Sequence, residues 1–209
     1  MPTGVELAGF FMARRVAVFI DYQNVYRRAQ SAFSSGPNHH TFGQIDPRKL
    51  GDLLVGRVPN GALAFVRVYR GQPDANRDPK GSAACSRQVA AWRTRANVEV
   101  FTRPLRYPPG YPAEKPSEKG IDVQLAIDFV VAALDDRFDV GVVVSADTDL
   151  KPAIETVLSR TELEVAVATW QGPSGRASRI SLPDRKIWCH YLHEQDFRAV
   201  QDPTDYTRA

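Results

Sequence analysis

Short runs of β-branched and apolar residues alternate along this chain with stretches whose apolar residues repeat at helical spacing. The runs are at residues 16–20, 62–69, 98–103, 140–145 and 163–170, with a less regular one at 186–192. Helical spacing occurs between them, at 25–33, 81–95 and 117–136. This alternation is typical of βαβ units, in which helices cover both faces of a parallel sheet. We therefore expect an α/β fold, a three-layer α/β/α sandwich with a mainly parallel central sheet of five or six strands.

The chain has 209 residues, of which 43% are apolar and 24% charged, enough for one sizeable core. We expect an N-terminal extension at 1–13, one domain at 14–195 and a C-terminal tail at 196–209. The first residues are either a loosely attached extension or the result of a start assigned to Met1 in place of Met12.

The sequence argues against a membrane-spanning protein and against a protein stabilised by disulfide bonds. No apolar stretch reaches the roughly 18 to 20 residues of a membrane span, and the first residues do not resemble a signal peptide. Cys85 and Cys189 form neither a zinc-binding spacing nor a disulfide framework. We expect a soluble protein of the reducing cytoplasm.

The net charge of +3 conceals an uneven distribution. Residues 57–119 contain 12 Lys or Arg against 5 Asp or Glu, whereas residues 120–164 contain 3 against 10. An acidic cluster beside a basic surface suits metal-dependent chemistry on a polyanion, because the metal needs carboxylates and the substrate needs cations. Solvated faces of ordinary helices give the same pattern, so charge alone does not decide.

Conspicuous acids follow two of the predicted strands. Asp21 directly follows the first, while Asp147 and Asp149 follow the fourth in "SADTD". Ligands of open parallel sheets bind at the carboxyl ends of the strands, so these acids converge if the two strands are neighbours. Asp122 opens the helix predicted after "KG". The sequence therefore predicts four carboxylates in one pocket.

Each acid also has a purely structural explanation. Asp21, and either Asp147 or Asp149, are suited to cap a helix, and Asp122 to complement a helix dipole. One cap explains only one of the two acids in "SADTD". Four acids this close need a cation to neutralise them, and an all-oxygen ligand set favours Mg²⁺ or Mn²⁺ over zinc.

Three segments carry a pattern of acids in a fixed order: "VAVFIDYQNV", "KGIDVQLAIDFVVAAL" and "VGVVVSADTDLKPAIETVL", the last followed by "LEVAVATW". The pattern is D-x-x-N after the first strand, K-x-x-D opening a helix and S-x-D-x-D after a later strand. Over about residues 14–170 it resembles the NYN domain family, PIN-like nuclease relatives that include the LabA-like (DUF88) proteins. Ala146 and Leu150 stand where glycine and phenylalanine are common, and neither difference removes a carboxylate.

The resemblance implies a PIN-like sandwich with the first strand central and a ribonuclease activity that depends on Mg²⁺ or Mn²⁺. The expected enzyme is an endoribonuclease, with attack at the ends of the RNA left open. The resemblance assigns Asp21, Asp122, Asp147 and Asp149 to the metal site, with Asn24 beside it, and all five to catalysis. RNA, single-stranded or structured, is the expected partner. Cleavage specificity, the number of metal ions and the oligomeric state are not predicted.

Other residues are candidates for holding substrate. Lys119 is expected to meet a phosphate, with a solvated loop lysine as the alternative, and Ser145 to fix the turn of Asp147. Arg67, Arg70 and Arg103 head a set of candidates for a groove along the RNA backbone, and the others are Arg77, Lys80, Arg87, Arg106, Arg176 and Arg179. Tyr107, Tyr111 and Trp170 are possible stacking surfaces or, equally, loop and core anchors.

Three further expectations concern packing. The helix near 117–136 is apolar on most sides and is expected to be buried, with a partner for Asp128. The proline-rich segment 103–120 is expected to form a loop over a binding face. The four histidines are expected in unrelated surface or strand positions.

Two rival functions remain open. One is an RNA-binding or regulatory NYN module with weak or absent catalysis. The other, a phosphatase-like enzyme, is disfavoured because the first strand carries no Asp-x-Asp and the chain has no glycine-rich phosphate loop.

Overall fold

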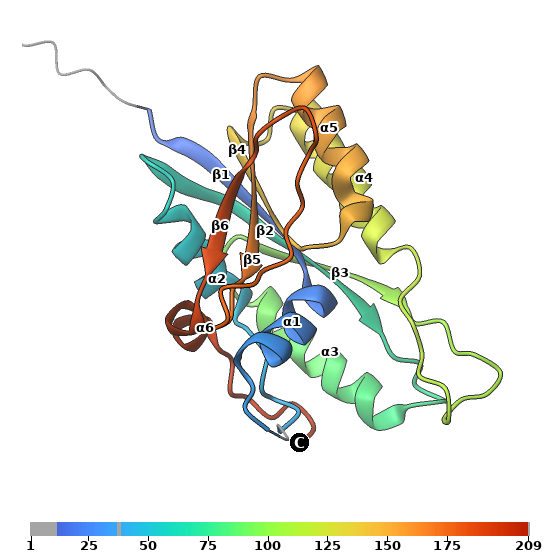
Figure 1. Cartoon of the computed structure of the whole chain (residues 1–209). Helices are drawn as coiled ribbons and strands as arrows, with labels where there is room; N and C mark the ends of the chain where they lie inside the picture. The colour runs from blue at the N-terminus through green and yellow to red at the C-terminus, as the bar shows by residue number, and fades with distance from the viewer. Residues whose placement is uncertain (1–11, 37–38, 209) are drawn as a thin grey trace, which may run out of the picture.

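A computed structural model describes residues 12–36 and 39–208. One six-stranded sheet forms the centre, and all its strand pairs are parallel. The strand order is β3 (Val98–Pro104), β2 (Gly61–Gln72), β1 (Arg14–Asp21), β4 (Val140–Val144), β5 (Glu164–Trp170) and β6 (Trp188–Leu192) (Figure 1). The order reverses between β1 and β4, which makes the carboxyl ends of these two central strands the expected ligand site.

Helices cover both faces of the sheet. One face carries α1 (Tyr22–Phe33), α2 (Pro47–Val55), α3 (Pro79–Arg93) and α6 (Glu194–Val200), and the other carries α4 (Ile121–Leu134) and α5 (Lys151–Arg160). Figure 1 shows α4 and α5 side by side. The predicted α/β/α sandwich and its parallel sheet are confirmed.

Alternation along β1 explains why both faces hold a core. Val16, Val18 and Ile20 pack toward α1, α2 and α3, whereas Ala17 and Phe19 pack toward α4 and α5. All five side chains are fully buried. A strand buried on both faces reads as a continuous apolar run, which is the pattern of "VAVFI".

The helix α4 is less buried than its sequence predicts. Leu125 and Phe129 lie in the core, but Val123, Ile127 and Val131 are about half exposed. The expectation of a helix buried nearly all round is wrong, because α4 packs on the sheet along one stripe and on α5 along another, which leaves its outer face in solvent. Asp128 has the expected partner, since the Tyr69 hydroxyl donates to its carboxylate at 3.0 Å.

Two short helices were missed by the sequence interpretation. Asp46 caps α2 by accepting from the backbone N–H groups of Arg48 and Lys49, and Pro47 occupies the first turn. A capping box opens α6 between His193 and Asp196. Both carry standard start signals, but they are too short for an apolar period to stand out.

The chain ends bear on the expected domain division. The segment 1–11 of the expected extension lies outside the described residues, and with it the question of Met1 or Met12 as the start. The C-terminal segment 196–208 contains most of α6 and returns to the body, where Gln201 bridges Ile45. The domain boundaries stay a prediction. Within the described parts of the chain, no helix combines the length and apolarity needed to cross a bilayer.

Candidate functional site

The first carboxylate of the site, Asp21, ends β1 and caps α1. Its Oδ1 accepts from the Asn24 backbone N–H at 3.2 Å, which makes it the N-cap of the helix. Its Oδ2 accepts from the Ser145 hydroxyl at 2.9 Å, and Ser145 directly follows β4. The cap explanation for Asp21 is therefore confirmed. Its second oxygen faces the end of the neighbouring strand, and its part in a metal site stays a prediction.

The turn after β4 is tied to the same place. The Ser145 hydroxyl accepts from the Asp147 N–H at 3.0 Å, so Ser145 does fix the turn of Asp147 as predicted. Asn24 adds a second link, because its Oδ1 accepts from the Ala146 N–H at 3.2 Å. Asp147 in turn accepts from the Asp149 N–H at 3.0 Å and opens a short 3₁₀ turn, Thr148–Leu150, ahead of α5. Asp21 of β1 and Asn24 of α1 thus hold in place the turn that carries Asp147 and Asp149.

Burial and neighbouring charge act together on Asp21. Burial raises the pKa of its carboxyl most strongly, and the negative charges of Asp147 and Asp122 raise it further, against the lowering effect of the Ser145 and Asn24 hydrogen bonds. Asp122 lies in the first turn of α4. The structure therefore brings Asp122 and Asp147 within electrostatic reach of Asp21.

A fifth acid, Glu118, belongs to this cluster and was missed. Burial raises the pKa of its carboxyl, the negative charge of Asp21 adds to that rise, and Arg27 and Arg70 oppose it. Its Oε1 accepts from the Gly71 N–H at 2.6 Å. A Cβ at Gly71 would lie 2.2 Å from the Leu105 side chain and 3.0 Å from that of Glu118, so any other residue here would displace one or both of these side chains. The signal was present in "SEKGID", but Glu118 precedes the helix and follows a long loop whose path the sequence does not specify.

Asp21, Asp147 and Glu118 line one open pocket of about 440 Å³, which we call the acidic pocket. Its lining residues come from the end of β1, from α1, from the loop just before α4 and from the turn after β4. They are Asp21, Gln23, Asn24, Arg27, Arg28, Ser31, Glu118 and Asp147. Asp149 and Lys119 are both exposed, and neither lines the acidic pocket. Of the five acidic and amide residues predicted for the site, Asp21, Asn24 and Asp147 line the pocket, Asp122 lies near it, and Asp149 faces solvent beside it.

The predicted groove arginines of β2 and β3 are engaged elsewhere. Arg67 pairs with Glu99 at 2.8 Å and lies over the Phe65 ring, and Arg103 donates to Gln124 at 2.6 Å. Arg70 donates to Gln88 and lies over the Tyr22 ring, although its charge reaches Glu118. Among these three only Arg70 contributes to the electrostatics of the acidic pocket.

The aromatic candidates serve as anchors. Trp170 is buried, and its indole N–H donates to the Val25 carbonyl at 3.0 Å, so it offers no stacking surface. The hydroxyl of Tyr107 accepts from the Asp74 N–H, and that of Tyr111 donates to the Arg77 carbonyl.

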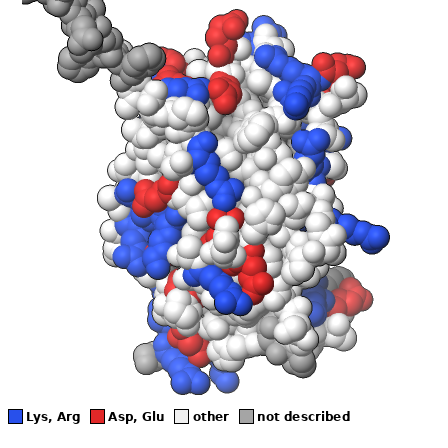
Figure 2. Space-filling model, turned by 60° about the vertical axis from the view of Figure 1, so that its left-hand side comes forward, with Lys and Arg blue, Asp and Glu red and all other residues white. Residues whose placement is uncertain are grey.

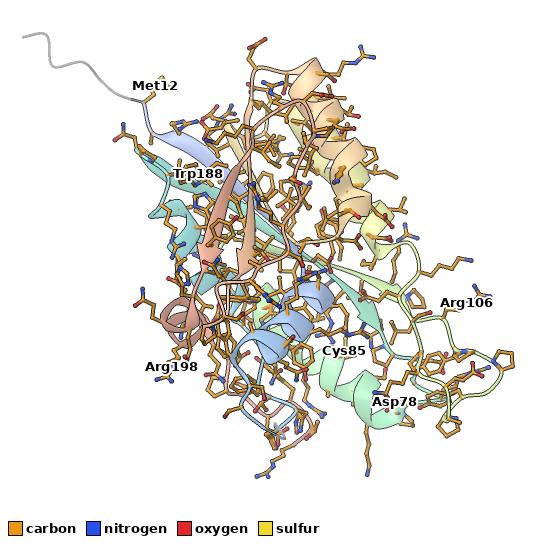
Figure 3. The ribbon with its side chains drawn as sticks, viewed as in Figure 1. Met12, Asp78, Cys85, Arg106, Trp188 and Arg198 are labelled. Carbon is orange, nitrogen blue, oxygen red and sulfur yellow. The ribbon has the colours of Figure 1, made fainter. Side chains whose placement is uncertain are left out.

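Both tyrosines therefore fasten the proline-rich loop to the segment between β2 and α3. Figure 3 shows Arg106 on this loop and Asp78 before α3 at the same end of the molecule. The loop therefore reaches the acidic pocket through Glu118 at its base, while its tyrosines are held by the segment 74–77.

The chemistry of the donors fits a hard divalent cation. Carboxylate and amide oxygens predominate, and Asp21 lies among like charges that a cation would neutralise. In the described residues, the three-ligand group whose donor atoms all lie within 4.8 Å is elsewhere, at His39, His40 and Asp205. The histidines are thus not all unrelated: an Asp205 carboxylate oxygen accepts a hydrogen bond from His40 Nε2 at 2.9 Å, which joins the loop after α1 to the C-terminal segment.

Comparisons with known proteins agree with this fold. A protein of unknown function from Vibrio parahaemolyticus has a similar solved structure, with a TM-score of 0.50 and 21% identity, covering 76% of this chain and 82% of that one. No curated protein matches the sequence. The family model of the NYN domain matches residues 15–182, which include β4, all of β1 except its first residue, and every residue of the acidic pocket. The chain therefore belongs to the NYN domain family.

Proposed function

We propose that this protein is a ribonuclease that hydrolyses RNA phosphodiester bonds with the help of Mg²⁺ or Mn²⁺ at the acidic pocket. The observation that carries the proposal is that Asp21 and Asp147 follow the two central, neighbouring strands and line one pocket, while Asp122 and Glu118 lie within electrostatic reach of Asp21. Membership of the NYN family, which belongs to a nuclease superfamily, supports a nuclease class.

Asp21 and Asp147 are the residues best placed to hold the cation, with Asp122, Asp149 and Glu118 contributing directly or through water. A bound divalent ion would supply an activated water and stabilise the negative charge that develops on the phosphate. Asn24 and Ser145 hold the carboxylates in position, since both bridge α1 and β1 to the turn after β4. Arg27 and Arg28 line the same pocket and offer positive charge to the substrate phosphate.

The test measures cleavage of single-stranded and structured RNA with Mg²⁺, with Mn²⁺ and with EDTA. We expect activity only with the metals, and a loss of about a hundredfold or more in kcat for Asp147→Asn. Asp184→Asn is the matched control, because Asp184 is exposed and does not line the acidic pocket. Activity that survives both EDTA and Asp147→Asn would exclude this site as its source.

The alternative is an RNA-binding or regulatory module. The same measurements distinguish it: RNA binding that needs no metal, with no cleavage under any of the three conditions, supports the alternative and overturns the nuclease proposal.

A further inference from the structure

A second groove adjoins the acidic pocket along α1. Arg28 and Ser31 line both, so the two adjoin along one face of α1. The second groove has a volume of about 600 Å³. One wall is α1, with Arg28, Ser31 and Ala32, and the other is the loop after β5, with Gly172 and residues 174–178. We call it the α1–β5 groove.

The walls of this groove are held in place by specific contacts. A Cβ on Gly172 would lie 2.8 Å from the Ala32 carbonyl oxygen, so glycine lets the loop approach α1 this closely. The loop folds back on itself, since Gly175 N–H donates to the Gly172 carbonyl at 3.0 Å and the Thr169 hydroxyl donates to the Ser178 carbonyl at 3.0 Å. Beneath it, the Trp170 indole is fixed to α1. The groove is therefore a built feature of the fold.

The charge of the lining changes from one hollow to the next. The acidic pocket contains Asp21, Glu118 and Asp147, whereas none of the described residues that line the α1–β5 groove is acidic. Arg28 and Arg176 supply its positive charge, and neither guanidinium forms an ion pair with a described residue. Serine hydroxyls supply most of the remaining polar groups. This lining suits phosphate oxygens and repels no part of a polyanion.

We propose that the α1–β5 groove binds the phosphate backbone of the RNA strand next to the bond that is cut. Two arginines and several hydroxyls contact the backbone, and Trp170, the aromatic residue of the lining, is buried and cannot stack on a base. Binding here is therefore independent of base sequence and sensitive to salt. The inference rests on the proposed function for its choice of ligand, but its test does not require cleavage.

The experiment measures the affinity of labelled single-stranded RNA by fluorescence anisotropy at several salt concentrations, in an Asp147→Asn background that prevents cleavage. The double variant Arg28→Ala with Arg176→Ala is compared with Arg198→Ala. Arg198, labelled in Figure 3, is an exposed arginine on α6 that pairs with Glu194 and lines neither the acidic pocket nor the α1–β5 groove. Circular dichroism and thermal melting check that each variant is folded.

We expect the double variant to bind about tenfold more weakly and to reduce the slope of log K against log salt by about 1.4, the value for two phosphate contacts on a single strand. Arg198→Ala should change neither. The weakening should be the same for oligomers of different base composition. An unchanged affinity and salt slope in a folded double variant would overturn the inference.

Cleavage separates this inference from the proposed function. With Asp147 intact, we expect the single variant Arg176→Ala to raise KM for a longer oligonucleotide but not for a dinucleotide. Arg176 lines the α1–β5 groove and not the acidic pocket, and the one phosphate of a dinucleotide occupies the acidic pocket. If the unmodified protein cleaves no RNA, the proposed function fails while the anisotropy result still decides the groove. If it cleaves RNA and the double variant binds normally, only the groove inference fails.

Discussion

Ser145 is the residue on which the geometry of the acidic pocket most depends. It is buried at the end of β4, where its hydroxyl donates to Asp21 and accepts from the backbone of Asp147. It thereby connects the carboxylate of one strand to the turn of the next. No histidine forms a hydrogen bond to it among the described residues, so its hydroxyl positions other groups and lacks the partner base of a serine nucleophile.

Replacing Ser145 with alanine should weaken both the fold and the site. Two buried hydrogen bonds are lost and Asp21 keeps an unpaired oxygen, so the free energy of unfolding should fall by about 1–3 kcal/mol. Metal-dependent cleavage should fall as well, and Ser145→Thr should restore part of it. Urea titration and an RNA cleavage assay measure the two effects. Ser159→Ala is the control, because the Ser159 hydroxyl bonds only the Thr156 carbonyl on the exposed side of α5. Equal stability of the two alanine variants would contradict the role given to Ser145.

Glu118 is the second decisive residue, because no sequence pattern singled it out. We expect Glu118→Gln to change the metal dependence of cleavage, shifting the half-saturating Mg²⁺ concentration upward by about tenfold or more. Asp147→Asn should abolish most activity even at saturating metal. Glu118→Gln therefore changes the metal concentration that cleavage needs, whereas Asp147→Asn changes the maximal rate. A Glu118→Gln enzyme with an unchanged metal titration would show that this carboxyl only holds the loop at Gly71.

Among the elements, α4 shows how one helix combines a core face and an exposed face. Phe129 is buried against Phe19 and Phe138, with ring centroids 5.1 and 6.0 Å away. Ile127, two residues earlier, is 54% exposed. The mean hydropathy of the helix does not separate the two positions, because the difference is set by α5 and the sheet.

The two positions should respond very differently to substitution. Phe129→Ala should lower the free energy of unfolding by about 3–5 kcal/mol, because it leaves a cavity between the sheet and α4. Ile127→Gln should change it by about 0.5 kcal/mol or less. Urea unfolding of both variants gives the comparison. A large loss for Ile127→Gln would show that this face is covered in solution, and analytical ultracentrifugation would then test for self-association.

In the whole molecule, ion pairs balance part of the uneven charge of the sequence. Arg14 and Arg15 at the start of β1 pair with Glu164, Asp136 and Asp139, all from the acidic stretch 120–164. Figure 2 shows acidic and basic side chains next to one another across the visible face. Part of the acidic excess therefore stabilises the end of the sheet opposite the pocket, and a smaller set of acids, Asp122, Asp147 and Asp149, remains near the site.

Asp139 makes stability depend on pH at this end of the sheet. Hydrogen bonds from the Arg15 side chain and backbone hold the pKa of its carboxyl below the usual range, so this contribution to stability is present at neutral pH and is lost as the pH falls below about 4. We expect Asp139→Asn to lower the free energy of unfolding at pH 7, and the difference from the unmodified protein to shrink at lower pH. Urea titrations across this range measure it, with Asp184→Asn as a pH-matched control. A difference that is constant with pH would exclude the ion pair as its cause.

The sequence by itself determined the class of fold, because the β-branched runs and the helical periods between them are local patterns. It also determined that Asp21, Asp147 and Asp149 follow strands and that Asp122 opens a helix. Only the tertiary structure decided which of these acids lie close together in the acidic pocket. The neighbouring of β1 and β4 brings Asp21 to Ser145, and the path of the proline-rich loop brings Glu118 to the same pocket. The tertiary structure also pairs Arg67 with Glu99 and Arg103 with Gln124. It places Arg28 and Arg176 in the lining of the α1–β5 groove. These outcomes depend on contacts between residues far apart along the chain, which periodicity and spacing do not encode.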